Sequence, residues 1–194
     1  MRCAPAPSCT PCNACARCWT EALRLFFALW PDAATRAALA AAAALLTLRD
    51  GRPVEPADLH VTLAFLGEVP QARVAELCAM AAALRQEPFE LEIATAGWWR
   101  RSRVAWLAPL RVPAPLVALA AALRDGAGAS TEPAASYRPH VTIARGVRRV
   151  PGLLAGFSVP WAVRSFALIA SNSAATGGRY QRLAEWPLTG AVFD

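Results

Sequence analysis

The hydrophobic and polar positions of the first half of the chain alternate between strand-like and helix-like patterns. Residues 24–30 (RLFFALW) form an apolar run that predicts a buried strand. An alanine-rich stretch that begins with Pro and Asp predicts a helix over residues 31–46. A second strand is predicted over residues 58–67, where a glycine ends it, and apolar residues at helical spacing predict a second helix over residues 70–86.

The second half repeats this order of elements. We predict strands over residues 89–97, 103–110, 137–146 and 179–188, one or two strands over 157–171 with Pro160 at an edge or a break, and a helix over 113–125. Helices mixed with short strands, and Pro and Gly between them, favour an α+β class with antiparallel pairing. Because no Pro-rich or charged linker separates the two halves, we expect them to form one body.

The composition permits a substantial core. Of the 194 residues, 56% are hydrophobic and 18% are charged, which suits one compact domain or two small lobes that share a core. No apolar run approaches the roughly 20 residues that cross a bilayer, and the run at residues 23–30 is followed by Pro31. We therefore expect no membrane association and no export signal, and a cytoplasmic location.

The formal net charge is +6, and all twenty basic residues are arginine. Codon bias is one explanation, because alanine is also abundant. The alternative is functional, since the planar guanidinium group forms paired hydrogen bonds with phosphate. The positive sign itself favours an anionic partner.

Five of the six cysteines lie before residue 19, and CTPCNACARC contains three overlapping C-x-x-C spacings, formed by Cys9, Cys12, Cys15 and Cys18. Three interpretations are open: a flexible extension, a zinc or iron–sulfur site, and disulfides. We expect residues 1–23 to be a flexible extension and residues 24–194 to be a single domain.

The two histidines of the chain begin nearly the same phrase, HVTLA at His60 and HVTIA at His140. If each phrase is a strand, the imidazole shares one face with the threonine two residues later, Thr62 or Thr142. The aliphatic residues then occupy the opposite face. Each phrase would bury its aliphatic side and present an imidazole beside a hydroxyl.

Two imidazoles across a gap can divide acid–base catalysis, one taking a proton and the other giving one. Threonine hydroxyls are suited to hold phosphoryl oxygens, so the set fits displacement at phosphorus without a metal. A single His-x-Thr phrase is more often structural than catalytic. Zinc catalysis usually needs three protein ligands, and although Asp58 precedes His60, nothing equivalent precedes His140. No G-x-S-x-G phrase or Gly-rich nucleotide motif is present.

Five phrases resemble the two-histidine phosphoesterase superfamily, and more narrowly the bacterial and archaeal RNA 2′,3′-cyclic phosphodiesterases, also called 2′-5′ RNA ligases. They are RLFFAL, LHVTLAFLG, GWWRRSRVAWLAP, YRPHVTIAR and SNSAATGGRYQRLAEWPL. The resemblance covers roughly residues 24–188. It implies a bilobal α+β fold, with two pseudo-symmetric lobes of antiparallel sheet and flanking helices around a central cleft.

The resemblance also implies hydrolysis of an RNA terminal 2′,3′-cyclic phosphate to a 2′-phosphomonoester, with no metal and no cofactor. In that scheme His60 is the proton donor, His140 is the proton acceptor, and Thr62 and Thr142 hold the phosphate. Arg145 would bind substrate. Strict alternation would place Arg145 on the face opposite His140, so we expect the strand to end or bulge there.

Trp98 and Arg101 are further candidates for RNA contact, by base stacking and phosphate neutralisation. Core packing is the alternative for the tryptophan. We expect a monomer whose partner is RNA with a cyclic phosphate end. Reverse 2′-5′ ligation, an RNA-binding protein without significant turnover, and a phosphodiesterase acting on a small cyclic nucleotide stay open as alternatives.

Overall fold

The computed structural model describes residues 22–129, 137–149, 152–153, 156–171 and 179–190. The cysteine-rich segment, for which we predict a flexible extension, lies outside these residues, apart from its last two positions. Its role therefore stays a prediction.

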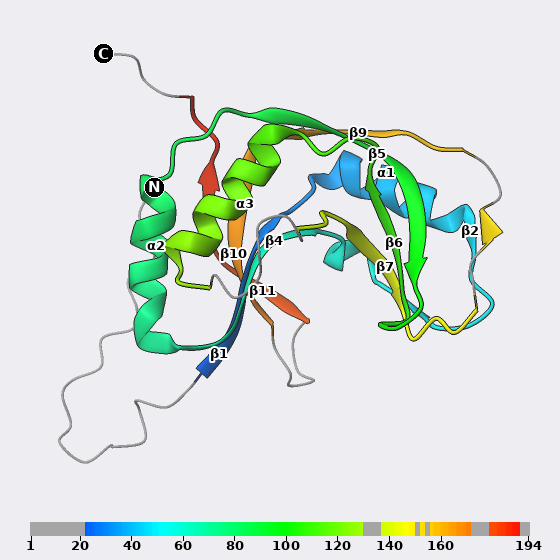
Figure 1. The fold of residues 1–194 in the computed structure, drawn as a ribbon, viewed down its shortest axis with the longest axis horizontal. Coiled ribbons are helices and arrows are strands. Elements are labelled where there is room, and N and C mark those ends of the chain that lie inside the picture. Colours follow the sequence, from blue (N-terminus) through cyan, green and yellow to red (C-terminus); the bar gives the residue numbers. More distant parts are fainter. Residues whose placement is uncertain (1–21, 130–136, 150–151, 154–155, 172–178, 191–194) are drawn as a thin grey trace.

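The centre of the fold is a nine-stranded antiparallel sheet, in the order β11-β10-β1-β4-β7-β6-β5-β9, with β3 also paired to β7 (Figure 1). On one side of the β4–β7 junction lie β1 (Ala22–Leu29), β4 (Val61–Pro70), β10 (Ser165–Ser171) and β11 (Tyr180–Pro187). On the other lie β5 (Phe89–Trp99), β6 (Val104–Pro109), β7 (Val141–Arg145), β9 (Val159–Val163) and β3 (Arg52–Pro53). A second, two-stranded sheet pairs β2 (Leu46–Thr47) with β8 (Gly152–Leu153). The predicted α+β class with antiparallel pairing is confirmed.

The two halves of the large sheet meet at a single residue pair, Val61 with Val141. In the strand order four strands lie on each side of this junction, and β3, which pairs with β7, is an additional strand on the β7 side. The finer prediction of two pseudo-symmetric lobes around a central cleft stays a prediction.

In the part of the chain that the structure describes, three α-helices flank the sheet. Helix α1 (Ala33–Ala44) begins after Asp32, whose carboxylate accepts a hydrogen bond from the Thr35 amide at 2.7 Å, and it packs against β9. Helix α3 (Ala114–Gly126) packs on β4, and α2 (Val74–Ala83) contacts α3 and β11. Each of α1 and α3 thus covers the half of the sheet opposite to the strand that precedes it in sequence (Figure 1). Among the described helices, none combines the length and hydropathy needed to span a membrane.

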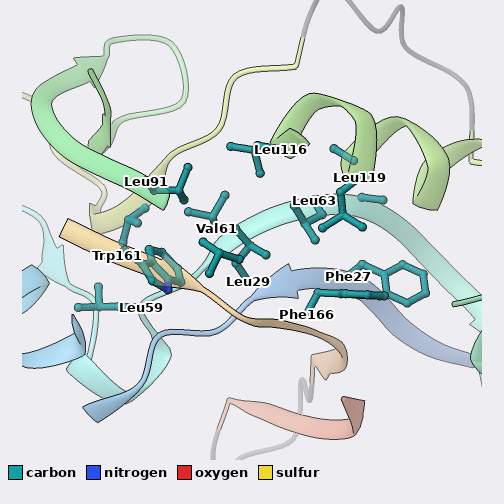
Figure 2. Close-up of a cluster of buried hydrophobic side chains, with 14 of the residues drawn as sticks. Phe27, Leu29, Leu59, Val61, Leu63, Leu91, Leu116, Leu119, Trp161 and Phe166 are labelled. Carbon is teal, nitrogen blue, oxygen red and sulfur yellow. The ribbon is translucent and has the colours of Figure 1, made fainter. Parts of the chain in front are cut away.

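The core lies beneath the two His-x-Thr phrases. Val61, Leu63 and Val141 are almost fully buried, as the alternating pattern predicts. Figure 2 shows Val61 and Leu63 among other buried side chains of one cluster, which also includes Leu116 and Leu119 of α3. Burial of each such side chain stabilises the fold by about 1.5–3 kcal/mol. The buried aliphatic faces therefore anchor the backbone that carries the histidines.

Several predicted boundaries were wrong, among them those of the second strand and the second helix. Strand β4 does not end at Gly67 but continues to Pro70, because β1 pairs with it as far as Ala22 opposite Pro70. The helix predicted from residue 70 is consequently shorter: a 3₁₀ turn, η2 (Gln71–Arg73), comes first, and α2 ends at Ala83. A second 3₁₀ turn, η1 (Pro56–Asp58), precedes His60.

Residues 157–171 form two strands in different halves of the sheet. Strand β9 ends at Val163 and β10 begins at Ser165, so the chain crosses between the halves at Arg164. Pro160 lies in β9, the last strand in the sheet order. The prediction of an edge position for this proline is confirmed, since an edge strand tolerates a residue without an amide proton.

Candidate active site

The junction between the two halves of the sheet aligns the two His-x-Thr phrases with each other. Val61 pairs antiparallel with Val141. The same register, extended by one residue each way, places His60 across from Thr142 and Thr62 across from His140. All four polar side chains then share the face opposite the buried valines, with the two histidines on a diagonal.

Both imidazoles are anchored in the same way. The Nδ1–H of His60 donates to the carbonyl oxygen of Asp58 at 2.6 Å, and the Nδ1–H of His140 donates to the carbonyl oxygen of Arg138 at 2.8 Å. A carbonyl oxygen only accepts, so it fixes the tautomer with the proton on Nδ1. Nε2 of each ring is left to exchange protons with a ligand.

A bulge in β7 controls the orientation of Arg145. Across from β7, Trp106 pairs with Thr142 while Ala105 pairs with Ala144, so the register passes over Ile143. The extra residue reverses the alternation and brings Arg145 to the face of His140 and Thr142. The expected bulge is confirmed, and the Arg145 guanidinium lowers the pKa of both His60 and His140 through its charge.

A matching bulge in β4 exposes Phe65. Ala28 pairs with Thr62 and Phe27 pairs with Ala64, which leaves Leu63 unpaired. Phe65, at the position in its phrase that Arg145 occupies in the other, thereby reaches the His60 face, where its side chain is 53% exposed. Phe65 was not predicted from the sequence as a site residue. Alignment of HVTLAF with HVTIAR was the signal that could have identified it.

Three aromatic rings surround His60. Trp30 is stacked on the imidazole, while the centroids of Phe26 and Tyr180 lie 5.1 and 5.2 Å from it. The pKa of His60 is lowered to about 4, mainly by burial, and the hydrogen bond to the Asp58 carbonyl opposes this effect. The positive charges of Arg145, His140 and Arg179 contribute to the lowering. None of the three aromatic residues was predicted from the sequence to contact His60.

His140 has a more open environment. Trp99 contacts it edge-on, with ring centroids 4.5 Å apart. Burial lowers the pKa of His140, and the hydrogen bond to Arg138 opposes this effect. Just upstream, the Tyr137 hydroxyl donates to the carbonyl oxygen of Thr62 at 3.1 Å, which ties the second phrase to the first.

Two adjoining cavities contain the histidines. The first, of about 270 Å³, is lined by His60, Thr62, Phe65 and other residues that include Arg24, Arg145, Arg179 and Tyr180. The second, of about 440 Å³, is lined by His140 together with Thr62, Phe65, Trp99, Tyr137, Arg124 and Arg138. Thr62 and Phe65 border both. Within the described part of the chain, the arginines of these cavities form no ion pair with a carboxylate, so the site is strongly electropositive.

The remaining candidates from the sequence lie elsewhere. The Trp98 indole N–H donates to the carbonyl oxygen of Val147 at 3.0 Å, and its ring packs against the core. Trp99, not Trp98, lines the cavity of His140. Arg101 is exposed in the turn between β5 and β6. RNA contact by Trp98 and Arg101 stays a prediction.

The described residues contain no group of three His, Cys, Asp or Glu side chains placed to hold a metal ion. The carboxylate nearest in sequence to a site histidine is that of Asp58, whose pKa is raised by burial. The groups that face the cavities are imidazoles, hydroxyls and guanidinium groups. Such a set can bind an anion and transfer protons to and from it.

Comparison with known proteins shows extensive similarity. The family described as "LigT like Phosphoesterase" matches residues 29–106. An RNA 2′,3′-cyclic phosphodiesterase of Escherichia coli (strain K12) is 39% identical over 142 residues, which cover 72% of this chain and 81% of that protein. One of Thermus thermophilus is 30% identical over 184 residues, covering 87% and 91% respectively.

Solved structures of this family are also similar to this chain. The crystal structure of E. coli LigT in apo form superposes with a TM-score of 0.76 at 38% identity and covers 88% of this chain and 99% of that one. The same protein complexed with 3′-AMP gives a TM-score of 0.74 at 38% identity, with the same coverage.

Proposed function

Because the chain belongs to the LigT-like phosphoesterase family, we propose that it hydrolyses the 2′,3′-cyclic phosphate at the end of an RNA to a 2′-phosphomonoester. One observation carries the proposal: the register at Val61 and Val141 brings two identically anchored imidazoles and two threonines to one face. The relatives that match most of this chain are named RNA 2′,3′-cyclic phosphodiesterases.

In the proposed reaction, Nε2 of His140 takes a proton from water while the water oxygen bonds to phosphorus. The bond between phosphorus and O3′ breaks, and His60 gives its Nε2 proton to O3′. Thr62 and Thr142 donate hydrogen bonds to the phosphoryl oxygens, where negative charge increases in the transition state. Arg145, on the same face, adds positive charge beside them.

The lowered pKa of His60 makes its protonation dependent on substrate. One negative charge about 4 Å away contributes roughly 4 kcal/mol at an effective dielectric constant of 20, which corresponds to about three pKa units. A bound phosphate therefore offsets the effect of burial and returns the His60 pKa to the neutral range. The parallel Trp30 ring also favours the imidazolium form by a cation–π interaction.

We further propose that the reaction needs no metal ion and that the same displacement can join RNA ends, which is the reverse of the cleavage of a 2′-5′ linkage. A 5′-hydroxyl in place of water would give its proton to His140 and attack the cyclic phosphate, and O3′ would leave with the proton of His60, so that a 2′-5′ linkage remains. A cytoplasmic monomer is the form we expect to act.

The test uses an oligoribonucleotide that ends in a 2′,3′-cyclic phosphate, with chelator present. His60→Asn and His140→Asn should each lower kcat at least a hundredfold, in keeping with the usual contribution of a general acid or base. Arg111→Gln, at an exposed position in the loop after β6, is the matched control. Near-normal turnover in either histidine variant would exclude the two-histidine mechanism.

Two alternatives would give different results in this assay. A protein that only binds RNA would give no product at any pH. An enzyme for small cyclic nucleotides would turn over the mononucleotide and not the oligonucleotide.

A further inference from the structure

A third cavity, of about 340 Å³, adjoins the candidate active site. Its lining consists of Asp50, Gly51, Arg52, Arg145, Gly146 and Arg148. We propose that this cavity binds the phosphodiester immediately preceding the terminal nucleotide, so that the enzyme prefers an RNA strand over a cyclic mononucleotide. The inference rests on the proposed function and specifies its substrate class.

Arg145 connects this cavity to the histidines. It lines the first cavity beside His60 and also lines the third. Across the β3–β7 pairing, Arg52 is its direct partner. Directly opposed residues on antiparallel strands have Cα atoms about 4.5–5.5 Å apart and project to the same face. The two arginines therefore offer neighbouring positive charges. Arg145 lies beside the proposed site of the reacting phosphate, and Arg52 lies in the third cavity.

The backbone around the third cavity is held in place by two loop-to-loop contacts. The Arg148 amide donates to Oδ1 of Asp50 at 2.9 Å, and the Val147 amide donates to the carbonyl oxygen of Arg103 at 3.0 Å. Gly51 has a φ of +91°, and a Cβ there would lie 2.8 Å from Cγ2 of Val147. Close packing of these loops fixes the backbone positions from which Arg52 and Arg148 extend.

The charge of this region matches a polyanion. Asp50 is the one carboxylate in the lining, and one of its oxygens already accepts the Arg148 amide. The three lining arginines make no ion pair among the described residues, and Nε of Arg145 is buried without a hydrogen-bond partner among them. The adjacent turn between β5 and β6 adds exposed guanidinium groups, from Arg100, Arg101 and Arg103. A cationic path of this kind is typical of single-stranded nucleic acid binding.

The experiment compares kcat/KM for two substrates with the same terminal base: an oligoribonucleotide with a 2′,3′-cyclic phosphate end, and the 2′,3′-cyclic mononucleotide. Arg52→Gln combined with Arg148→Gln should lower the value for the oligonucleotide about tenfold, because two charge-assisted contacts are lost. The value for the mononucleotide should stay within twofold, which also shows that the variant folds. The slope of log(kcat/KM) against log salt concentration for the oligonucleotide should become less steep by roughly 0.7, the usual contribution of one phosphate contact in a single strand.

Two further variants make the result decisive. Arg111→Gln, with the same loss of charge, should leave both values unchanged. Arg124→Gln alters the second cavity, which is the alternative path for the strand. Three results would overturn the subsite. The double variant could lose kcat/KM equally on both substrates, or on neither. Alternatively, the preference for the oligonucleotide could be lost in Arg124→Gln alone. Failure of the wild-type enzyme to turn over either substrate would overturn the proposed function, and the subsite with it.

Discussion

The indole of Trp30 lies parallel to the imidazole of His60, with ring centroids 5.2 Å apart and an angle of 1° between the planes. His140 has no such stacked partner among the described residues, and its contact with Trp99 is edge-on. The two halves of the site therefore share their backbone register but not their side-chain environment. This asymmetry fits different roles for the two histidines.

Trp30 should act as a positioning residue for His60. Trp30→Ala should lower kcat about tenfold, because the His60 imidazole would lose the stacking contact that holds its orientation. Water would also reach the imidazole, and because burial is the largest cause of the lowered His60 pKa, this gain in hydration should outweigh the lost cation–π interaction and raise the pKa. The alkaline limb of the kcat/KM–pH profile should then move to higher pH. Trp30→Phe should restore most of kcat; equal losses in both variants with an unchanged pH profile would contradict a positioning role.

The pH dependence of the free enzyme should differ from that of the complex. The general acid must be protonated, and without an anion nearby the pKa of His60 is about 4. Because kcat/KM reports the free enzyme and kcat the complex, the alkaline limb of kcat should lie at least one pH unit above that of kcat/KM. Steady-state kinetics between pH 4 and 9 would measure both. Coinciding alkaline limbs would show that the phosphate does not restore the His60 proton.

The stability of the fold should decrease in acid, because the pKa of His60 is lowered in the folded state. The folded-state pKa of His60 lies below the unfolded value of 6.5, so the unfolded state binds more protons between pH 6.5 and about 4. The free energy of unfolding should therefore fall as pH falls through this window, by up to about 1.4 kcal/mol per pH unit for one such group. His60→Asn should show a smaller decrease. Urea denaturation at pH 7 and pH 5 would measure it, and identical decreases in both proteins would be the contrary result.

Arg145 should contribute to catalysis through its positive charge and through the planar geometry of its guanidinium group. Arg145→Gln should lower kcat/KM about tenfold to a hundredfold, through loss of charge-assisted hydrogen bonds to phosphate. The charge of Arg145 lowers the pKa of His140, which must be neutral to act as the base. Its removal should raise that pKa and move the acid limb to higher pH. Arg145→Lys keeps the charge but not the planar fork, so it should restore the acid limb and only part of kcat/KM; full restoration of kcat/KM would argue against paired hydrogen bonds.

The sequence predicted those parts of the site that depend on local alternation. The shared face of His60 and Thr62, and the burial of Val61 and Leu63, follow from the period of two along a strand. The period of two could not place Phe65, because the bulge at Leu63 arises from pairing with β1. Without that bulge, simple alternation would bury the side chain of Phe65. The aromatic rings around His60 depend on the order β10-β1-β4, which only long-range pairing determines.

Hydrolysis of a cyclic-phosphate-ended oligoribonucleotide in ¹⁸O-labelled water, with chelator present, tests the central claim most directly. The product can be identified by ³¹P NMR and mass spectrometry. Direct attack by a water that His140 activates predicts a 2′-phosphomonoester with one ¹⁸O atom on phosphorus, and no such product from the His60→Asn or His140→Asn variant. A 3′-phosphomonoester, dependence on a metal ion, or the same labelled product from either histidine variant would contradict the account.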